Sequence, residues 1–175
     1  MTLGNLKKKI YSVLAIDETT ELPTLCYAID STARKVASLC RCIKRKADIT
    51  FAGGKAEAPA DFICAAAEMP VIDFYDGKLT IADGESATIP VVYYAYPEEV
   101  TDSTDNETEL PYGGMAFDAV AYGAAGELCA SVRPGDVRRY MEIMTEYDER
   151  IAGMYSANIK SVSPAVFCGA RRIRR

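Results

Sequence analysis

The stretch that decides the fold runs from Ile89 to Leu128 and reads IPVVYYAYPEEVTDSTDNETELPYGGMAFDAVAYGAAGEL. It starts as an apolar strand that ends at Tyr96-Pro97, continues as a run of acidic and hydroxyl residues, and becomes a helix of small residues near Tyr112. Helices and hairpins are predicted before it, and a second long helix with a basic tail after it. The sequence therefore predicts an α+β fold with N-terminal helices, a central antiparallel β-hairpin block and a C-terminal antiparallel helical hairpin.

The length of 175 residues predicts a single domain, residues 1–175. Within it we expect helices at 1–47, antiparallel strands at 48–96, an acidic loop at 97–111, a helical hairpin at 112–157 and a basic tail at 158–175. The net charge of −5 argues against extensive nucleic-acid binding. Neither an export signal nor an apolar run of ~20 residues is recognisable, so a soluble protein is expected.

The residue types available for chemistry are few. The chain contains no histidine, which removes the commonest general base and the commonest metal ligand. Its six cysteines are scattered, most of them in apolar periodic segments, and we expect buried, reduced thiols. Acidic pairs lie in turns and exposed loops, where nothing would shift their pKa values. The sequence predicts a protein that is not an enzyme, with no catalytic residue, cofactor or metal.

Two amphipathic helices are predicted before the strands. The first covers Leu3 to Ala15, with Thr2 as its N-cap, and the second runs from Pro23 to Lys46. Their apolar stripes are Leu6, Ile10, Val13 and Leu14 in the first, and Ile29, Ala33, Val36, Cys40, Ile43 and Ala47 in the second. Basic residues lie off the second stripe, at Arg34, Lys35, Arg41, Lys44 and Arg45. They form either a solvated helix face or a contact surface for an acidic partner or for passing DNA.

The sequence of the central block, residues 48–96, predicts short strands joined by tight turns. Strands are expected at 49–51, 71–75, 78–82 and 86–96, with Asp76-Gly77 and Asp83-Gly84 as hairpin turns. Pro90 predicts an edge position or a bulge in the last strand. Alternation places Val91, Tyr93 and Ala95 on one face of that strand and Val92, Tyr94 and Tyr96 on the other. Both faces carry apolar or aromatic groups, which predicts cover on both sides, from the chain's own helices or from a neighbouring subunit.

The segment from Glu98 to Glu109 holds six acidic residues and no basic one. It lacks the apolar content to pack and predicts an exposed, mobile loop, whose simplest role is to keep the protein soluble. A helix of small residues is expected over 114–131, packed at the centre of the helical part. After a turn at 133–135, a fourth helix is expected from Pro134 to about Tyr155. Its apolar stripe is Val137, Tyr140, Met141, Met144, Tyr147, Ile151 and Met154.

The last segment, 158–175, contains five basic residues and no acidic one. It predicts either a disordered tail or an arm that becomes ordered on an acidic surface.

The order of these features resembles the small head–tail connector (adaptor) proteins of tailed bacteriophages, which are often encoded in prophages. TLGNLKKKIYSVL is similar to their first helix, and Pro59-Ala60-Asp61-Phe62 to a segment after their first strand. YYAYPEEVTDSTDNETEL resembles their exit from the strand, and LPYGGMAFDAVAYGAAGEL their alanine-rich third helix. The likeness covers residues 1–157. Ala60 and the arginine-rich end depart from the family pattern.

The resemblance implies a structural virion component at the head–tail junction, assembled in the host bacterial cytoplasm. It would form a ring, possibly a dodecamer, beneath the portal protein, meet a head-closure or tail-completion protein, and let DNA pass without specific binding. Portal contacts would fall on Arg171, Arg172, Arg174 and Arg175. Subunit or channel contacts would fall on Glu98, Glu99, Asp102, Asp105, Glu107, Glu109, Tyr94 and Tyr96. The alternative is a cytoplasmic, non-enzymatic α+β module that binds a peptide or ligand on the Tyr93–Tyr96 sheet face.

Overall fold

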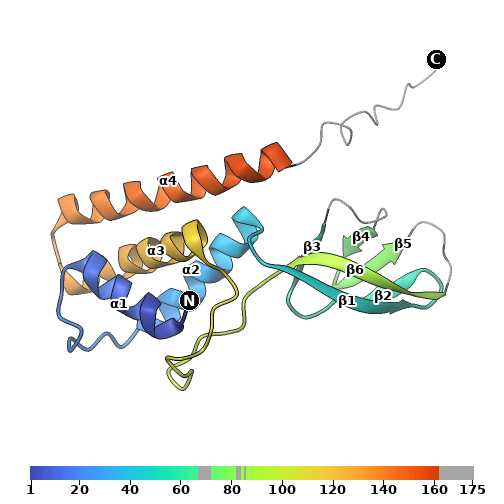
Figure 1. Ribbon diagram of the computed structural model, residues 1–175, viewed down its shortest axis with the longest axis horizontal. Helices are drawn as coiled ribbons and strands as arrows, with labels where there is room; N and C mark the ends of the chain where they lie inside the picture. The colour runs from blue at the N-terminus through green and yellow to red at the C-terminus, as the bar shows by residue number, and fades with distance from the viewer. Residues whose placement is uncertain (67–71, 82–83, 85, 162–175) are drawn as a thin grey trace, which may run out of the picture.

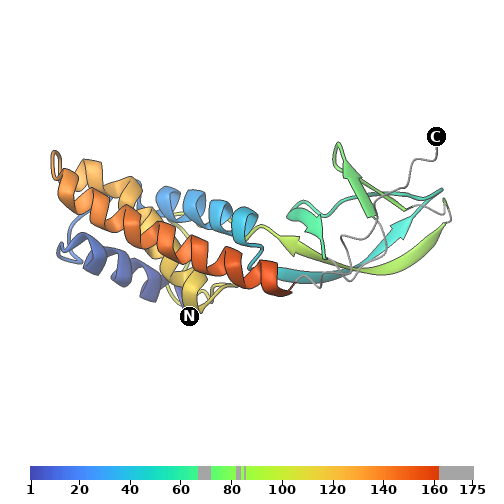
Figure 2. The ribbon, with the colours of Figure 1, turned by 90° about the horizontal axis from the view of Figure 1, so that it is seen from above.

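The structure, a computed structural model, describes residues 1–66, 72–81, 84 and 86–161, with the side chains of 157–161 left out. Four helices form a bundle, and two small antiparallel sheets form a β lobe beyond one end of it (Figures 1 and 2). The helices come first and last in the chain and the strands lie between them, which confirms the predicted α+β class.

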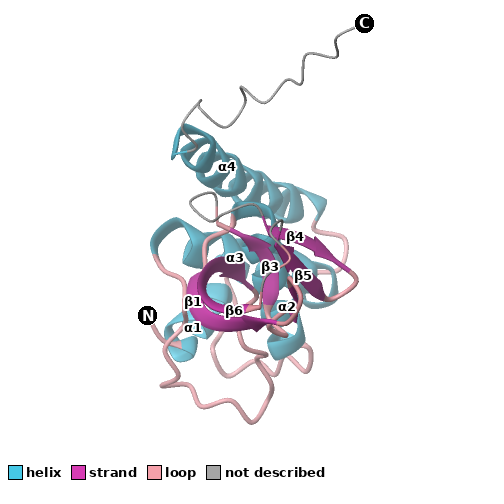
Figure 3. Cartoon of the chain, turned by 90° about the vertical axis from the view of Figure 1, so that its right-hand side faces the viewer, coloured by secondary structure: helices cyan, strands magenta, loops and turns pink. Residues whose placement is uncertain are grey.

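The bundle is built around one helix of small residues. The bundle consists of α1 (Leu3–Leu14), α2 (Leu25–Cys40), α3 (Gly114–Val132) and α4 (Val137–Ser161), and α3 is the helix of small residues. α3 is buried on nearly all sides, as its predicted central place requires, and its buried residues include Ala119, Gly123 and Ala124. α4 runs back antiparallel beside it, as predicted (Figure 1). Small side chains let the neighbouring helices approach α3 closely. α3 therefore lies at the centre of the bundle, which Figure 3 shows in a view along the long axis.

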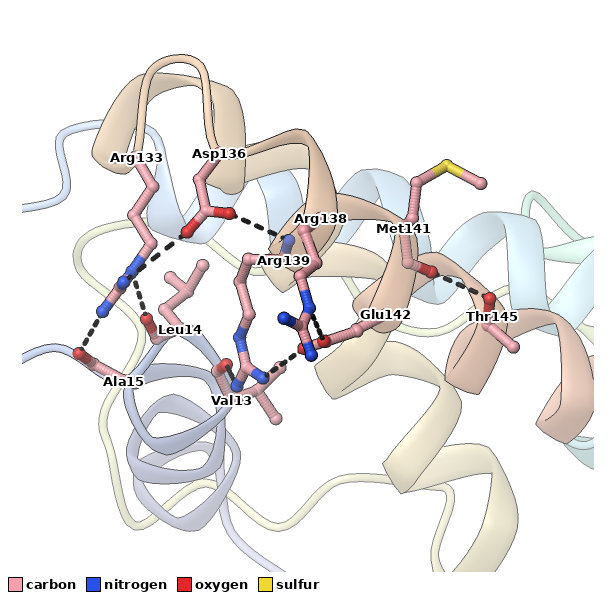
Figure 4. A network of polar contacts seen from close by, with 10 residues as sticks. All are labelled: Val13, Leu14, Ala15, Arg133, Asp136, Arg138, Arg139, Met141, Glu142 and Thr145. Carbon is pink, nitrogen blue, oxygen red and sulfur yellow. Dashed lines mark hydrogen bonds and ion pairs between the residues drawn. The ribbon is translucent and has the colours of Figure 1, made fainter.

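The first helix forms as the sequence predicts, and both of its ends are bonded. The Thr2 hydroxyl accepts the Asn5 amide at 3.4 Å, and the predicted apolar stripe is buried. At the C-terminal end, Arg133 donates to the carbonyls of Leu14 (2.9 Å) and Ala15 (2.6 Å), and Arg139 donates to that of Val13 (Figure 4). The last carbonyls of a helix have no partner within it, so Arg133 at the end of α3 and Arg139 in the first turn of α4 satisfy them.

The second helix ends six residues earlier than predicted. It stops at Cys40 because Arg41 adopts a left-handed conformation, with φ of 49°, that terminates the helix. Its stripe up to Cys40 is buried as expected, but Ile43 lies beyond the helix and Ala47 lies in a strand. The segment predicted as the last helical turn therefore begins the β lobe.

The fourth helix differs from the prediction at both ends. It begins at Val137 and continues to Ser161, so residues 158–161 belong to the helix and not to the tail. Its predicted stripe is also partly wrong, because Val137, Tyr140 and Met141 are exposed. The fully buried position is Ile143, which the stripe omitted.

The β lobe contains two three-stranded sheets. The strands are β1 (Lys44–Phe51), β2 (Lys55–Glu57), β3 (Phe62–Ala65), β4 (Ile72–Tyr75), β5 (Lys78–Ile81) and β6 (Ala87–Ala95). The sheet orders are β1-β6-β3 and β2-β5-β4, with antiparallel pairing throughout. Asp76 and Gly77 both have positive φ, as the predicted two-residue hairpin turn requires. The sequence predicted neither β2 nor β3 as a strand, and it placed the start of β1 five residues late.

The long strand β6 lies in the centre of its sheet, yet Pro90 causes no conflict there. The described pairing of β3 covers only Tyr93 to Ala95, so Pro90 lies beyond it. On the other side Pro90 is paired with Asp48 of β1. Pairs in an antiparallel sheet alternate between hydrogen-bonded and non-hydrogen-bonded ones, and Asp48–Pro90 is of the second kind, so the N–H that proline lacks is not needed there. Val91, Tyr93 and Ala95 are buried and the opposite face is half-buried, so the predicted alternation is confirmed.

One cluster of buried residues continues from the bundle into the β lobe. It joins bundle residues such as Leu6 and Val120 to Tyr93 and Leu79 of the strands. In the described part of the chain, no helix is both long and apolar enough to cross a membrane. Whether the chain behaves as one domain in unfolding stays a prediction.

Candidate functional site

The acidic loop, residues 98–109, is exposed as predicted but is bonded along the start of α1. The amides of Leu3 and Gly4 donate to the carbonyls of Thr108 (2.9 Å) and Asn106 (2.8 Å). The Leu110 amide donates to the Met1 carbonyl at 2.9 Å. Loop carbonyls thus satisfy amides in the first turn of α1, which have no partner within the helix. This arrangement could not be predicted from the sequence, because the loop and the start of α1 are about 100 residues apart in the chain.

The other end of the loop is fixed on α2. Val100 is buried, and its amide donates to Asp30 Oδ1 at 3.2 Å. The other carboxylate oxygen of Asp30 accepts Arg34 Nε at 2.8 Å. A turn stabilised by the Thr101 and Thr104 hydroxyls follows. The loop therefore connects the exit of β6 to both α1 and α2.

A groove of about 280 Å³ lies between the two ends of the acidic loop, beside Arg45 of β1, and we call it the exit groove. Its apolar lining comes from Pro97, Val100, Leu110, Pro111 and Tyr112. Its acidic rim comes from Glu98, Glu99 and Glu109. The groove thus combines apolar surface with carboxylates at the point where the chain leaves the β lobe.

The predicted acidic set is divided by the structure. Glu98, Glu99 and Glu109 come together at the groove, whereas Asp102, Asp105 and Glu107 are exposed and do not line it. Glu98 pairs with Arg45 at 3.4 Å, an ion pair that is weak because the Glu98 side chain is 90% exposed. Asp105 Oδ1 accepts the Glu107 amide at 3.0 Å, which shapes the turn.

The tyrosines of β6 lie in different surroundings. Tyr93 is buried, stacks on Phe62 with ring centroids 5.4 Å apart, and donates its hydroxyl to Asp61 at 3.1 Å. Tyr94 and Tyr96 are half-buried, and the Arg34 guanidinium lies 6.0 Å from the Tyr96 ring. The surface predicted for ligand binding at Tyr93–Tyr96 is therefore largely occupied by the chain's own side chains.

Asp61 is a polar centre that sequence reasoning did not assign. It accepts Arg45 Nη1 at 2.8 Å and the Tyr93 hydroxyl, and so links three segments of the β lobe. Its carbonyl also accepts the Tyr96 amide at 2.8 Å. The only signal in the sequence was an acidic residue directly before the apolar run of β3.

The basic residues around α2 pair mostly within the chain. Arg34 pairs with Asp30, Lys35 with Glu127 at 2.9 Å, and Arg45 with Asp61. This favours the solvated helix face among the two interpretations, and the contact with an acidic partner or with DNA stays a hypothesis.

The cysteines show no arrangement for chemistry in the described residues. Cys26, Cys40 and Cys129 are buried, and Cys42 and Cys64 are half-buried. Burial raises the pKa of the Cys42 thiol to about 11, which disfavours the reactive thiolate. Nowhere in the described part do three or more Cys, Asp or Glu side chains gather as a metal site would require. Cys168 and the predicted portal contacts Arg171, Arg172, Arg174 and Arg175 lie outside the described residues.

No known family model matches the chain, and no curated protein is significantly similar to it.

Proposed function

We propose that this protein is a head–tail connector of a tailed bacteriophage, a non-enzymatic ring component between the portal and the tail. The observation that carries the proposal is the continuous unit formed by the β6 exit, the acidic loop and α3. Its sequence resembles the connector pattern from YYAYPEEV to AYGAAGEL. Its structure places an acidic loop against α1 and α2 at the junction of bundle and β lobe.

The charge of the loop supports a role beside moving DNA. Its carboxylates are exposed and, in the described residues, only Glu98 forms an ion pair. A wall of exposed carboxylates repels phosphates, so DNA would slide past it without binding. The same residues would serve equally as subunit contacts within a ring, where a neighbour supplies the opposite charge.

The decisive experiment mixes the full chain with the portal ring encoded in the same genome and images the mixture by electron microscopy. We expect an added ring of density on one face of the portal. A monomer in the absence of portal is compatible with the proposal, because assembly can require the portal surface. A portal that stays bare at micromolar concentrations of both proteins would overturn it.

The role of the tail in portal docking is tested separately. Changing Arg171, Arg172, Arg174 and Arg175 to Gln should reduce portal binding at least tenfold, because four charge-assisted contacts are lost. The control replaces four exposed lysines, Lys8, Lys46, Lys55 and Lys78, by Gln and removes the same charge elsewhere. Equal effects of the two variants would exclude a specific docking role for the tail.

The second candidate, a peptide- or ligand-binding module, has the exit groove in its favour. Such a protein would be a monomer or dimer in solution and would not bind the portal ring. Neighbouring genes for a portal, a capsid protein and a tail-completion protein would favour the connector.

A further inference from the structure

The exit groove has an apolar lining and an acidic rim whose charge is only partly balanced. Glu98 pairs with Arg45, but Glu99 and Glu109 form no ion pair among the described residues. A groove of this kind favours an occupant that carries both apolar and basic side chains. Guanidinium groups suit the rim best, since they bind carboxylates through two parallel hydrogen bonds.

The chain carries such a segment at its C-terminal end. Residues 171–175 read Arg-Arg-Ile-Arg-Arg, an apolar side chain flanked by four guanidinium groups. We propose that the exit groove binds residues 171–175 of the same chain. The arginines pair with Glu99 and Glu109 at the rim, and Ile173 packs on the apolar lining.

The last turns of α4 pack beside the start of α3, the helix that follows the groove in the chain. Gly153 of α4 packs against Met115, since a Cβ at Gly153 would lie 3.0 Å from Met115 Sδ. Met115 is three residues after Tyr112, which lines the groove.

The remaining chain is long enough to return. From Gly153, α4 continues to Ser161, a rise of about 12 Å. The nine residues from 162 to 170, which would link α4 to the docked segment, span up to about 30 Å when extended. The proposal requires this link to return to the groove of its own chain without any change in α4.

This contact is independent of the proposed function, since it needs only the groove and the tail. If the tail arginines also bind a portal, the groove and the portal compete for them. Docking should weaken at high ionic strength, because the ion pairs form at a partly exposed rim.

A paramagnetic label on the full chain tests the proposal. A nitroxide is attached to Cys168 in a chain whose half-buried Cys42 and Cys64 are changed to Ala. Amide signals of residues 98–100 and 109–112 should fall below half of their diamagnetic intensity. They should recover at least twofold in Glu99→Gln/Glu109→Gln and in 0.5 M salt.

The matched control is Glu18→Gln/Glu21→Gln, which removes two exposed carboxylates from the α1–α2 loop. It should leave the broadening unchanged. Broadening that survives the groove substitutions, or that the control abolishes equally, would overturn the proposal. So would broadening seen only when labelled chains are mixed with isotope-labelled, nitroxide-free chains, since the tail would then dock on a second copy.

Discussion

Tyr112 and Tyr93 are both buried, and their hydroxyl groups meet different surroundings. The Tyr93 hydroxyl donates to Asp61, whereas that of Tyr112 has no hydrogen-bond partner among the described residues. A buried unpaired hydroxyl costs about 1–3 kcal/mol. We therefore expect Tyr112→Phe to leave the free energy of unfolding unchanged or to raise it by up to ~1 kcal/mol, while Tyr93→Phe lowers it by ~1 kcal/mol. Urea unfolding measures the free energy of unfolding of both variants. A larger decrease for Tyr112→Phe than for Tyr93→Phe would contradict the expectation.

The buried hydroxyl of Tyr112 should also make the free energy of unfolding depend on pH. Burial raises the pKa of its hydroxyl above the ordinary value near 10. The folded state therefore holds this proton more tightly than the unfolded state, so the contribution to stability is complete below about pH 10 and is lost as the pH rises further. Other buried tyrosines act in the same direction, so the difference between wild type and Tyr112→Phe is the readout. Urea unfolding at pH 8 and at pH 10.5–11 should show this difference shifting in favour of the variant.

Gly123 fills a position where no side chain fits. A Cβ there would lie 2.5 Å from Thr32 Cγ2 and 2.9 Å from Tyr147 Cε2. Gly123→Ala should lower the free energy of unfolding by about 1–2 kcal/mol, because overpacking outweighs the gain of ~1 kcal/mol in helix propensity. The control is Gly153→Ala, where the neighbour is the flexible end of the half-exposed Met115. The control should be neutral or stabilising in thermal denaturation, and equal losses would refute the packing argument.

At the level of elements, Arg133 at the end of α3 and Arg139 in the first turn of α4 hold α1 in place. Arg133 and Arg139 bond three consecutive carbonyls at its C-terminal end (Figure 4). Either arginine changed to Ala should cost about 1 kcal/mol, since the side chains are one-third exposed and the full value of a charged hydrogen bond is not reached. Amide exchange in the last turn of α1 should accelerate. Arg138→Ala removes a neighbouring, almost fully exposed arginine and should leave the α1 amides unchanged.

The elements also show what sequence reasoning can reach. α1 and α3 were predicted almost to the residue, because a capping threonine, a clean apolar stripe and a run of small residues act locally. The end of α2 was missed because the left-handed Arg41 carries no glycine or asparagine signal. The α4 stripe failed at its start, where Val137, Tyr140 and Met141 are exposed and Ile143 is the buried side chain.

The candidate site was predictable in its charge and not in its geometry. Counting residues reveals an acidic loop, but Glu99 and Glu109 meet at the groove only because the loop bonds to the start of α1. Likewise Asp61 becomes a polar centre only when β3 pairs beside Tyr93. Such pairings depend on contacts between distant segments, which local patterns do not encode.

For the whole molecule, the distribution of buried side chains predicts that the β lobe opens before the bundle. Nine of the twelve largest fully buried side chains belong to the four helices, and only Phe51, Leu79 and Val91 belong to strands. Two three-stranded sheets with so small a share of the core have a lower local stability than a bundle packed around a largely buried helix.

Two probes separate the lobes in one urea titration. All four helices lie in the bundle, so the circular dichroism at 222 nm follows it. The chain has no tryptophan, and Phe74→Trp in β4, where the side chain is nearly half exposed and touches Phe62, gives a fluorescence signal from the β lobe alone. We expect the fluorescence transition at a lower urea concentration than the loss of helix. Coincident transitions would instead mean that the cluster continuing through Tyr93 couples the lobes, and the chain would then unfold as one cooperative domain.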